Sequence, residues 1–265
     1  MINIDKNLFL QHPKNIIAIT SGVGSMGKTW LATTLAQALN MHKRSVLLVD
    51  GGGGLANLDY QLNLSAKQTI NEVVDGAITI NQALIPINKR KFDVLTASSG
   101  SDLLEGLSVG QLQILREDLL AVAQNYQYTI IDLPSSEKII KQLMPPQINL
   151  LVVCTDDPSN LVATYNFLQS DNINNNYANL QIVVNYASSY EGGLRTYNTL
   201  RQACEQFVRQ TPPLCGVIRR DTRVRDAIRN NVLLLNRYPN AEAAEDVMKI
   251  AAQFIEQEKE DGFSF

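Results

Sequence analysis

Four residues near the start of the sequence have the types and the spacing of a phosphate-binding loop. Gly22, Gly27, Lys28 and Thr29 lie in the stretch SGVGSMGKTW and fit the pattern G-x-x-x-x-G-K-[ST]. In such a loop the glycines let backbone N–H groups approach a polyphosphate, the lysine reaches the β and γ phosphates, and the threonine hydroxyl can hold Mg²⁺. The alternative is a glycine-rich turn that binds no ligand.

A further candidate is the acidic residue that ends a later apolar run. Asp132 closes the stretch YTIID, where a carboxylate beside the loop would position the water shell of the magnesium ion. An aspartate that caps the following helix is the alternative. Taken together, the loop and the acid predict a site for ATP or ADP with Mg²⁺.

These residues need strands and helices that bring them together, and the sequence supplies both in alternation. NIIAIT precedes the loop as a buried strand, and TWLATTLAQALNMH follows it with apolar residues at helical spacing. SVLLVD, FDVLTA, NLLVVCT and LQIVVNYA have the composition of further strands, and helical stretches lie between them. The pattern predicts an α/β fold with a single doubly wound, mostly parallel sheet, helices on both faces, and a ligand at the carboxyl ends of the strands.

The chain of 265 residues is long enough for one large α/β domain. We expect a leader at residues 1–14, a P-loop NTPase-like domain at residues 15–255 and an acidic tail at residues 256–265. The asparagine-rich stretch NINNNYANL is expected to be an exposed loop.

Composition restricts the kind of partner and the compartment. A net charge of −3 gives no general attraction to nucleic acid or to anionic lipid. Cys154, Cys204 and Cys215 lack metal-site or disulfide spacing, so they are expected to be buried free thiols. No targeting sequence and no apolar run of membrane-spanning length is present, which predicts a cytoplasmic protein.

Several stretches in register resemble the MinD/ParA group of P-loop ATPases, whose phosphate-binding loop is of the deviant type. They are ITSGVGSMGKTWLATTLAQAL, RSVLLVDGGGGLANLD, VVCTDDPSNLVATYNFL and IVVNYASSYEGGLRTYNTL. Within the group, GLANLDYQLNL and VRDAIRNNVLLLNRYPNAEAA are most similar to the FlhG/FleN regulators of flagellar number. The resemblance extends from about Asn15 to Phe254 and implies a MinD-like fold of the SIMIBI class.

The resemblance also assigns site residues. It implies that Asn185 recognises adenine and that Asp50 is the first acid of the family's D-x-D pattern. The magnesium candidates, acting through water, are then Thr29, Asp50 and Asp132. The candidates for nucleotide binding are Gly22, Gly24, Ser25, Gly27, Lys28, Thr29, Trp30 and Asn185.

Four positions depart from the family pattern. Val23 stands where the family has a lysine that reaches the partner's nucleotide in an ATP-bound dimer, and a neutral side chain cannot neutralise phosphate charge. Gly52 stands where the family has the aspartate that orients the attacking water. Ser136 replaces a glycine near the γ-phosphate, and Arg219 replaces a proline that borders the base.

The departures predict that the protein binds nucleotide but hydrolyses it weakly or not at all, and no residue is identified as catalytic. The resemblance implies a FlhG/FleN-like regulator whose partners include a FleQ-type flagellar transcription activator and the GTPase FlhF. In that case the protein is cytoplasmic and reaches the inner membrane peripherally through partners. One alternative is an active MinD/ParA-type ATPase that forms a homodimer and cycles on membrane or DNA. The other is a nucleotide-free scaffold.

Two C-terminal stretches bear on direct membrane or DNA binding. AAEDVMKIAAQFIEQEKE has apolar residues at helical spacing, but its polar face is acidic, so a core-packed helix is favoured over a membrane-inserting one. RRDTRVRDAIR concentrates arginines, which either form a patch for an acidic partner or DNA or are salt-bridged on a solvated helix. The second reading is favoured, so neither direct membrane binding nor direct DNA binding is expected.

Overall fold

The computed structural model describes residues 13–51, 58–64, 66–89, 91–98, 103–174, 176–207 and 211–260. Its strands are β1 (Ile16–Ser21), β2 (Val46–Asp50), β3 (Ile85–Asn88), β4 (Phe92–Leu95), β5 (Tyr128–Asp132), β6 (Asn149–Cys154), β7 (Asn179–Ala187) and β8 (Leu214–Arg219). Its α-helices are α1 (Lys28–Met41), α2 (Leu58–Gln61), α3 (Ile70–Val74), α4 (Leu103–Gly106), α5 (Val109–Ala123), α6 (Glu137–Leu143), α7 (Pro158–Gln169), α8 (Asp171–Asn174), α9 (Tyr190–Phe207), α10 (Thr222–Arg229), α11 (Leu234–Arg237) and α12 (Glu242–Glu260). Short 3-10 turns lie at Pro13–Asn15 and Ile80–Ala83.

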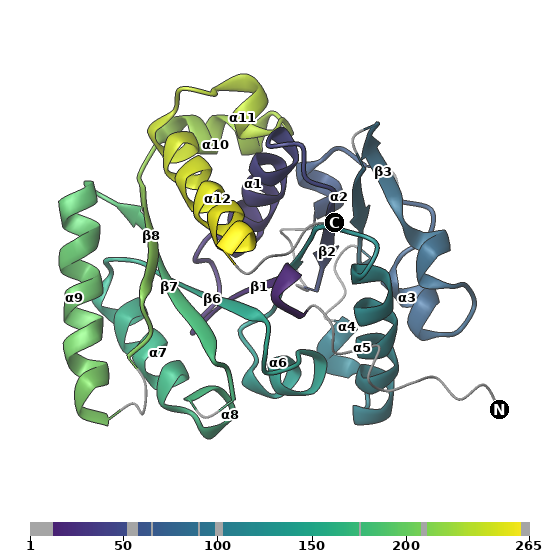
Figure 1. Ribbon diagram of the computed structural model, residues 1–265, viewed down its shortest axis with the longest axis horizontal. Helices are drawn as coiled ribbons and strands as arrows, with labels where there is room; N and C mark the ends of the chain where they lie inside the picture. The colour runs from purple at the N-terminus through teal and green to yellow at the C-terminus, as the bar shows by residue number, and fades with distance from the viewer. Residues whose placement is uncertain are drawn as a thin grey trace.

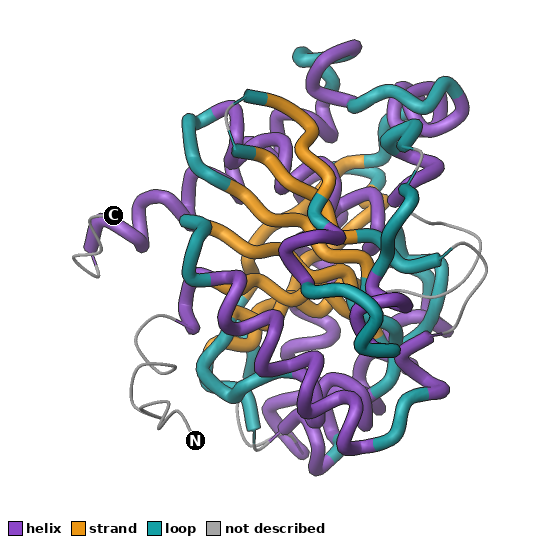
Figure 2. The backbone as a smooth tube through the Cα atoms, turned by 90° about the vertical axis from the view of Figure 1, so that its right-hand side faces the viewer, coloured by secondary structure: helices purple, strands orange, loops and turns teal. Residues whose placement is uncertain are grey.

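The described strands form one eight-stranded sheet in the order β3-β4-β2-β5-β1-β6-β7-β8. Neighbouring strands pair in parallel, except that β3 runs antiparallel to β4 at one edge. Every residue of β1, β2 and β5 is buried, as expected where helices cover both faces of a parallel sheet. Figure 2 shows the strands side by side in the middle of the molecule with helices around them.

Two hydrophobic cores lie on opposite faces of this sheet. One core contains residues of α1, α10, α11 and α12, such as Leu31 and Val247. The other contains residues of α3, α5, α6, α7 and α9, such as Leu115 and Phe167. In Figure 1 α1 and α12 accordingly lie on one side of the sheet, and α5 to α9 lie on the other. The predicted doubly wound α/β fold is confirmed.

The C-terminal helix α12 packs against the core, as the sequence predicts. Ala243, Val247, Ile250 and Phe254 recur along one side of it and are buried. The helix continues to Glu260, so residues 256–260, which the sequence pattern assigns to the tail, are helical. Among the described helices, none combines the length and the apolar character needed to cross a membrane.

The expectation of an exposed loop at NINNNYANL is wrong. Helix α8 covers Asp171–Asn174, and both Ile173 and Tyr177 are buried. The Tyr177 hydroxyl donates to the Ile140 carbonyl at 2.9 Å. The two apolar side chains of this polar stretch therefore anchor it to α6.

The three cysteines are buried free thiols, which confirms the prediction. They lie apart, in β6, in α9 and in β8. Burial raises the pKa of Cys154 to about 12, that of Cys204 to about 11 and that of Cys215 to about 12. Thiols of this kind are almost entirely protonated at neutral pH.

Candidate functional site

The predicted phosphate-binding loop joins the carboxyl end of β1 to the amino end of α1. Strand β1 lies between β5 and β6. The strand order reverses here, because β2 to β5 lie on one side of β1 and β6 to β8 lie on the other. In open α/β sheets such a switch point is where ligands bind. The loop also places the first backbone N–H groups of the 14-residue α1 at this crevice, and these groups favour an anion.

Two glycines of the loop are required by their surroundings. A Cβ on Gly22 would lie 2.4 Å from the Ala163 carbonyl oxygen. Gly27 has a φ of 84°, and a Cβ there would lie 2.5 Å from Asn185 Nδ2. A Cβ on Gly24, in contrast, would meet no atom of the described residues within 4 Å, so the middle of the loop faces open space.

Lys28 begins α1 and points at two hydroxyl groups. Its Nζ donates to Ser21 Oγ at 3.0 Å and to Ser135 Oγ at 3.1 Å. Burial lowers the pKa of Lys28, and the negative charge of Asp132 opposes that shift. A partly desolvated ammonium group held by neutral acceptors is well suited to bind a phosphate oxygen.

Thr29 and Asp132 form the polar pair next to this lysine. Thr29 Oγ1 donates to Asp132 Oδ2 at 2.5 Å. Asp132 Oδ1 is buried and has no hydrogen-bond partner among the described residues. Burial raises the pKa of Asp132 to about 6, against the opposing effects of the Thr29 hydrogen bond and the Lys28 charge. An unsatisfied carboxylate oxygen beside a hydroxyl fits the oxygen ligands and ordered waters of Mg²⁺.

Asp50 reaches the same edge of the sheet. Strands β2 and β5 pair with Asp50 opposite Asp132. The Asp50 carboxylate accepts a hydrogen bond from the Leu58 N–H at 3.2 Å, and the Gly51 N–H donates to the Asp132 carbonyl at 2.8 Å. Gly52, which holds the place of the family's second acid, lies outside the described residues.

Asn185 lies under the loop and ties it to β7. Its Nδ2 donates to the Met26 carbonyl at 2.9 Å, its Oδ1 accepts the Tyr186 N–H at 2.9 Å, and 3% of the residue is exposed. Both polar ends of the side chain therefore have protein partners. Tyr186 follows with a φ of 59° and 40% exposure, so an aromatic ring stands next to the loop.

The remaining candidates of the loop differ in accessibility. Ser25 is exposed and has a φ of 64°, and Val23 is 39% exposed. Trp30, in the first turn of α1, is 8% exposed. Its side chain packs into the core on that face of the sheet, and its Nε1 has no hydrogen-bond partner among the described residues. A contact between Trp30 and a nucleotide would therefore come from the backbone N–H.

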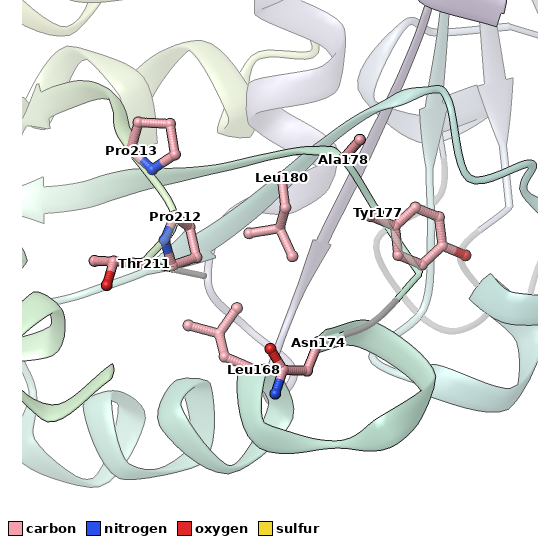
Figure 3. A pocket seen from close by; sticks show the side chains of 8 residues that line it. All are labelled: Leu168, Asn174, Tyr177, Ala178, Leu180, Thr211, Pro212 and Pro213. Atoms are coloured by element: carbon pink, nitrogen blue, oxygen red, sulfur yellow. The ribbon is translucent and has the colours of Figure 1, made fainter. Parts of the chain in front are cut away.

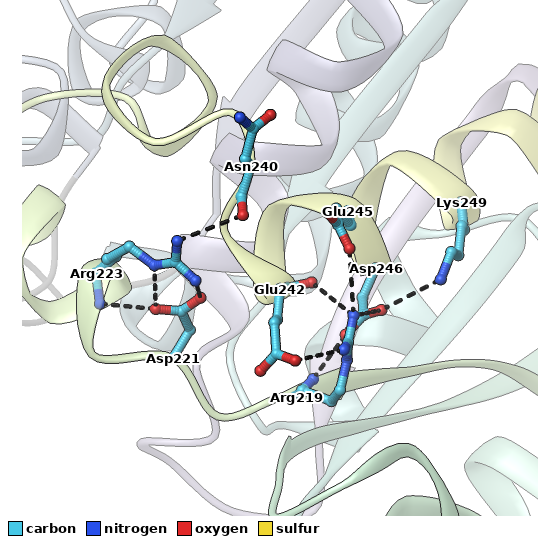
Figure 4. Close-up of polar contacts among 8 residues, drawn as sticks. All are labelled: Arg219, Asp221, Arg223, Asn240, Glu242, Glu245, Asp246 and Lys249. Atoms are coloured by element: carbon cyan, nitrogen blue, oxygen red, sulfur yellow. Dashed lines mark hydrogen bonds and ion pairs between the residues drawn. The ribbon is translucent and has the colours of Figure 1, made fainter.

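The two other departures from the family pattern lie in unstrained surroundings. Ser136 precedes α6 with a φ of −126°, a conformation that any residue adopts. The Arg219 guanidinium contacts two acidic residues of α12, Asp246 Oδ2 at 2.8 Å and Glu242 Oε1 at 2.7 Å (Figure 4).

Two of the clustered arginines, Arg219 and Arg223, form the predicted salt bridges. Figure 4 also shows Arg223 paired with Asp221, the residue that caps α10, at 2.8 Å. Arg220, Arg225 and Arg229 are exposed. The cluster is thus divided between residues that hold β8, α10 and α12 together and residues that face solvent.

Sequence reasoning missed two residues of the site, Ser21 and Ser135. Their hydroxyl oxygens lie 3.0 Å apart, and each accepts a hydrogen bond from Lys28. The signal available was the position of each serine: Ser21 ends β1, and Ser135 lies three residues beyond Asp132, where β5 ends. Neither position is part of the P-loop pattern, so only the folded chain brings them to the lysine.

A small hollow, of about 50 Å³, lies at the opposite edge of the sheet (Figure 3). It opens near the amino ends of β7 and β8, and its lining includes Leu168, Tyr177, Pro212 and Pro213. With Asn174 and Thr211 also in the lining, the hollow offers polar and apolar surface in about equal parts. The polar groups suited to phosphate and magnesium lie at the loop instead.

Comparison with known proteins agrees with this geometry. Residues 17–235 match the family model of the CobQ/CobB/MinD/ParA nucleotide binding domain. The antiactivator FleN of Pseudomonas aeruginosa is 27% identical over 241 residues, which cover 90% of this chain and 85% of that protein. An uncharacterized ATP-binding protein of Methanocaldococcus jannaschii is 29% identical over 253 residues, which cover 90% of this chain and 87% of that protein. The septum site-determining protein MinD of Pyrococcus horikoshii, solved with Mg-ADP, has a similar fold, with a TM-score of 0.71 at 20% identity over 90% of this chain and 94% of that one.

Proposed function

Since this chain belongs to the CobQ/CobB/MinD/ParA nucleotide-binding family, we propose that it is a FlhG/FleN-like regulator that binds ATP or ADP with Mg²⁺ and hydrolyses ATP weakly or not at all. The observation that carries the proposal is the arrangement of Lys28, Thr29 and Asp132 at the end of β1. Lys28 points into the crevice from α1, and Thr29 contacts the buried carboxylate of Asp132 at 2.5 Å. The similarity to FleN, itself an antiactivator, supports a regulatory role.

Each group has a defined task in binding. The backbone N–H groups between Gly22 and Gly27 surround the phosphates, and Lys28 contributes the positive charge. Thr29 and Asp132 hold the magnesium ion and its waters, and a bound Mg²⁺ neutralises phosphate charge. The pairing of β1 with β5, which brings the loop next to Asp132, supports this assignment.

Weak hydrolysis follows from what the sequence lacks. Val23 is neutral at the position where the family's lysine crosses to a partner's nucleotide. Gly52 has no side chain to orient an attacking water. The sequence thus keeps the groups that bind phosphate and lacks two that act on it.

Regulation then requires that nucleotide binding change a surface that a partner recognises. Such a change occurs only if the two surface states differ in nucleotide affinity. We propose a FleQ-type flagellar transcription activator as a partner, with the GTPase FlhF as a second one, and control of flagellar number as the outcome. This role places the protein in the cytoplasm, with contact to the inner membrane through partners.

The single tryptophan of the chain provides the test. Trp30 follows Thr29 directly and is buried, so phosphate binding to the first turn of α1 should change its fluorescence. We expect a saturable change on titration with Mg-ATP or Mg-ADP. The Lys28→Ala variant should bind at least about tenfold more weakly, because it lacks a charge-assisted hydrogen bond. Lys67→Ala, which removes an exposed lysine, is the matched control.

Phosphate release from the same samples separates the alternatives. Binding without release supports the proposed regulator. Lys28-dependent release, together with a dimer on size-exclusion chromatography with a non-hydrolysable ATP analogue, would instead identify an active MinD/ParA-type ATPase. If no nucleotide binds, the chain is a scaffold that retains the loop without its ligand.

A further inference from the structure

Lys28, Ser21 and Ser135 form a closed set of three polar groups at the centre of the site. The lysine Nζ lies 3.0 Å from Ser21 Oγ and 3.1 Å from Ser135 Oγ, and the two hydroxyl oxygens lie 3.0 Å apart. We propose that Ser135 is a positioning residue that occupies the place of a phosphate at Lys28 in the nucleotide-free protein and competes with nucleotide for this cation. The inference rests on the proposed nucleotide binding.

The turn that carries Ser135 is fixed to β1. Thr20 Oγ1 donates to the Pro134 carbonyl at 3.0 Å, and the Leu133 N–H donates to the Ile19 carbonyl at 2.9 Å. The proline ring also restricts φ at Pro134. The backbone therefore presents the Ser135 hydroxyl to the lysine in a defined position.

The two serines differ in how easily they can release the lysine. Ser21 is fully buried, and its hydroxyl also donates to the Val23 carbonyl at 2.5 Å, so it is part of the loop itself. Ser135 is half-buried and lies in the turn before α6. Ser135 is therefore the partner that an incoming phosphate would displace.

Competition follows from the chemistry of the acceptors. Without nucleotide, the partly desolvated ammonium group needs acceptors, and the two hydroxyls offset part of its lost hydration. A phosphate oxygen is a stronger acceptor because it is charged. The Lys28–Ser135 hydrogen bond stabilises the empty state, so its loss on binding weakens the apparent nucleotide affinity.

The test compares nucleotide affinity in Ser135→Ala and in the native protein by Trp30 fluorescence. We expect Ser135→Ala to bind Mg-ADP and Mg-ATP about three- to tenfold more tightly, since a net hydrogen bond of about 1 kcal/mol no longer has to be broken. A purely structural serine would give the opposite sign. Ser135→Thr keeps a hydroxyl and should restore the native affinity.

A hydroxyl outside the site gives the control. Thr199 is exposed on α9 and its hydroxyl donates to the Arg195 carbonyl at 3.1 Å, so Thr199→Ala should leave the affinity unchanged. A second readout needs no nucleotide. In urea unfolding, Ser135→Ala should cost less stability in a Lys28→Ala background than in the native background, because the two side chains interact.

The outcomes separate this inference from the proposed function. If the native protein binds nucleotide and Ser135→Ala binds equally or more weakly, the placeholder role is wrong and the proposed function stands. If only Ser135→Ala binds, the native chain does not bind as proposed, and the competition by Ser135 is confirmed in its strongest form. If neither protein binds nucleotide, both proposals fail.

Discussion

Asp132 is the residue at which protonation, folding and metal binding are coupled. Burial raises its pKa from 3.8 to about 6 in the folded protein. A carboxyl group with a raised folded-state pKa binds protons more tightly when folded, so its contribution to stability is full below the unfolded pKa and is lost as the pH rises through about 6. Without the metal, the ionised form of Asp132 that Mg²⁺ needs is therefore the less stable form at this buried position.

Magnesium-dependent nucleotide affinity should therefore fall when the pH is lowered from about 7.5 to about 5.5, because protons then compete with the metal for Asp132. Titrations of Trp30 fluorescence with and without a chelator measure the magnesium-dependent part. In Asp132→Asn this part should be small at both pH values. A magnesium-dependent part that does not vary with pH in the native protein would contradict the assignment of Asp132.

The same residue makes a prediction for the nucleotide-free protein. We compare the free energy of unfolding of Asp132→Asn with that of the native protein. The difference should shift by about 1 kcal/mol in favour of the variant between about pH 5 and about pH 7.5, because only the native protein must ionise a buried carboxyl group at the higher pH. Urea unfolding at the two pH values measures this difference. An equal effect of the substitution at both values would show that the group ionises without cost.

At the scale of residues, the sequence predicts the site residues that belong to a motif, and it misses those that only the folded chain brings to the site. Type and spacing predict Lys28, Thr29 and Asp132, and these residues lie together. No pattern predicts Ser135, because its contact joins chain segments that no local pattern relates. Asn185 is predicted to meet adenine, whereas its described contacts are with Met26 and Tyr186. Its role toward a base stays a prediction.

At the scale of elements, Arg219 joins β8 to α12. Its Nε and one terminal nitrogen contact both oxygens of Asp246, whose side chain is buried. The Arg219 backbone N–H also donates to Asp246 at 3.0 Å. A single buried carboxylate therefore links the end of the sheet to the closing helix, in addition to the apolar packing of α12.

Arg219→Met should destabilise the fold by about 3 kcal/mol, because it leaves the buried charge of Asp246 without its main partner. Urea unfolding measures the change. Arg225→Met removes an exposed arginine from α10 and should change stability by no more than about 0.5 kcal/mol. Equal effects of the two substitutions would show that the Asp246 contact contributes little.

Element prediction succeeds where apolar residues dominate a segment, and it fails where proline or polar residues interrupt them. The long runs of β1, β2, β6 and β7 are predicted as strands because burial on both faces leaves a continuous apolar sequence. The four-residue β3 contains Pro86, and the four-residue α8 lies among asparagines. Tertiary contacts, such as the burial of Ile173, decide these short elements, and they are not visible in a local pattern.

For the whole molecule, the two cores on either side of the sheet enclose all three cysteines. We expect a thiol reagent such as Ellman's reagent to modify none of them on the time scale of minutes in the native protein, since burial raises each pKa to about 11 or 12. After denaturation all three should react. Fast reaction of one thiol in the native protein would show that its helix or strand opens locally.

The antiparallel strand β3 has a consequence for how copies of this protein can meet. An exposed strand edge can act as a template for another chain and lead to fibrillar aggregation. Here the β3 edge is four residues long, contains Pro86, which has no N–H to donate, and changes register between Pro86 and Asn88 (Figure 1). This edge therefore resists extension of the sheet from one molecule into the next.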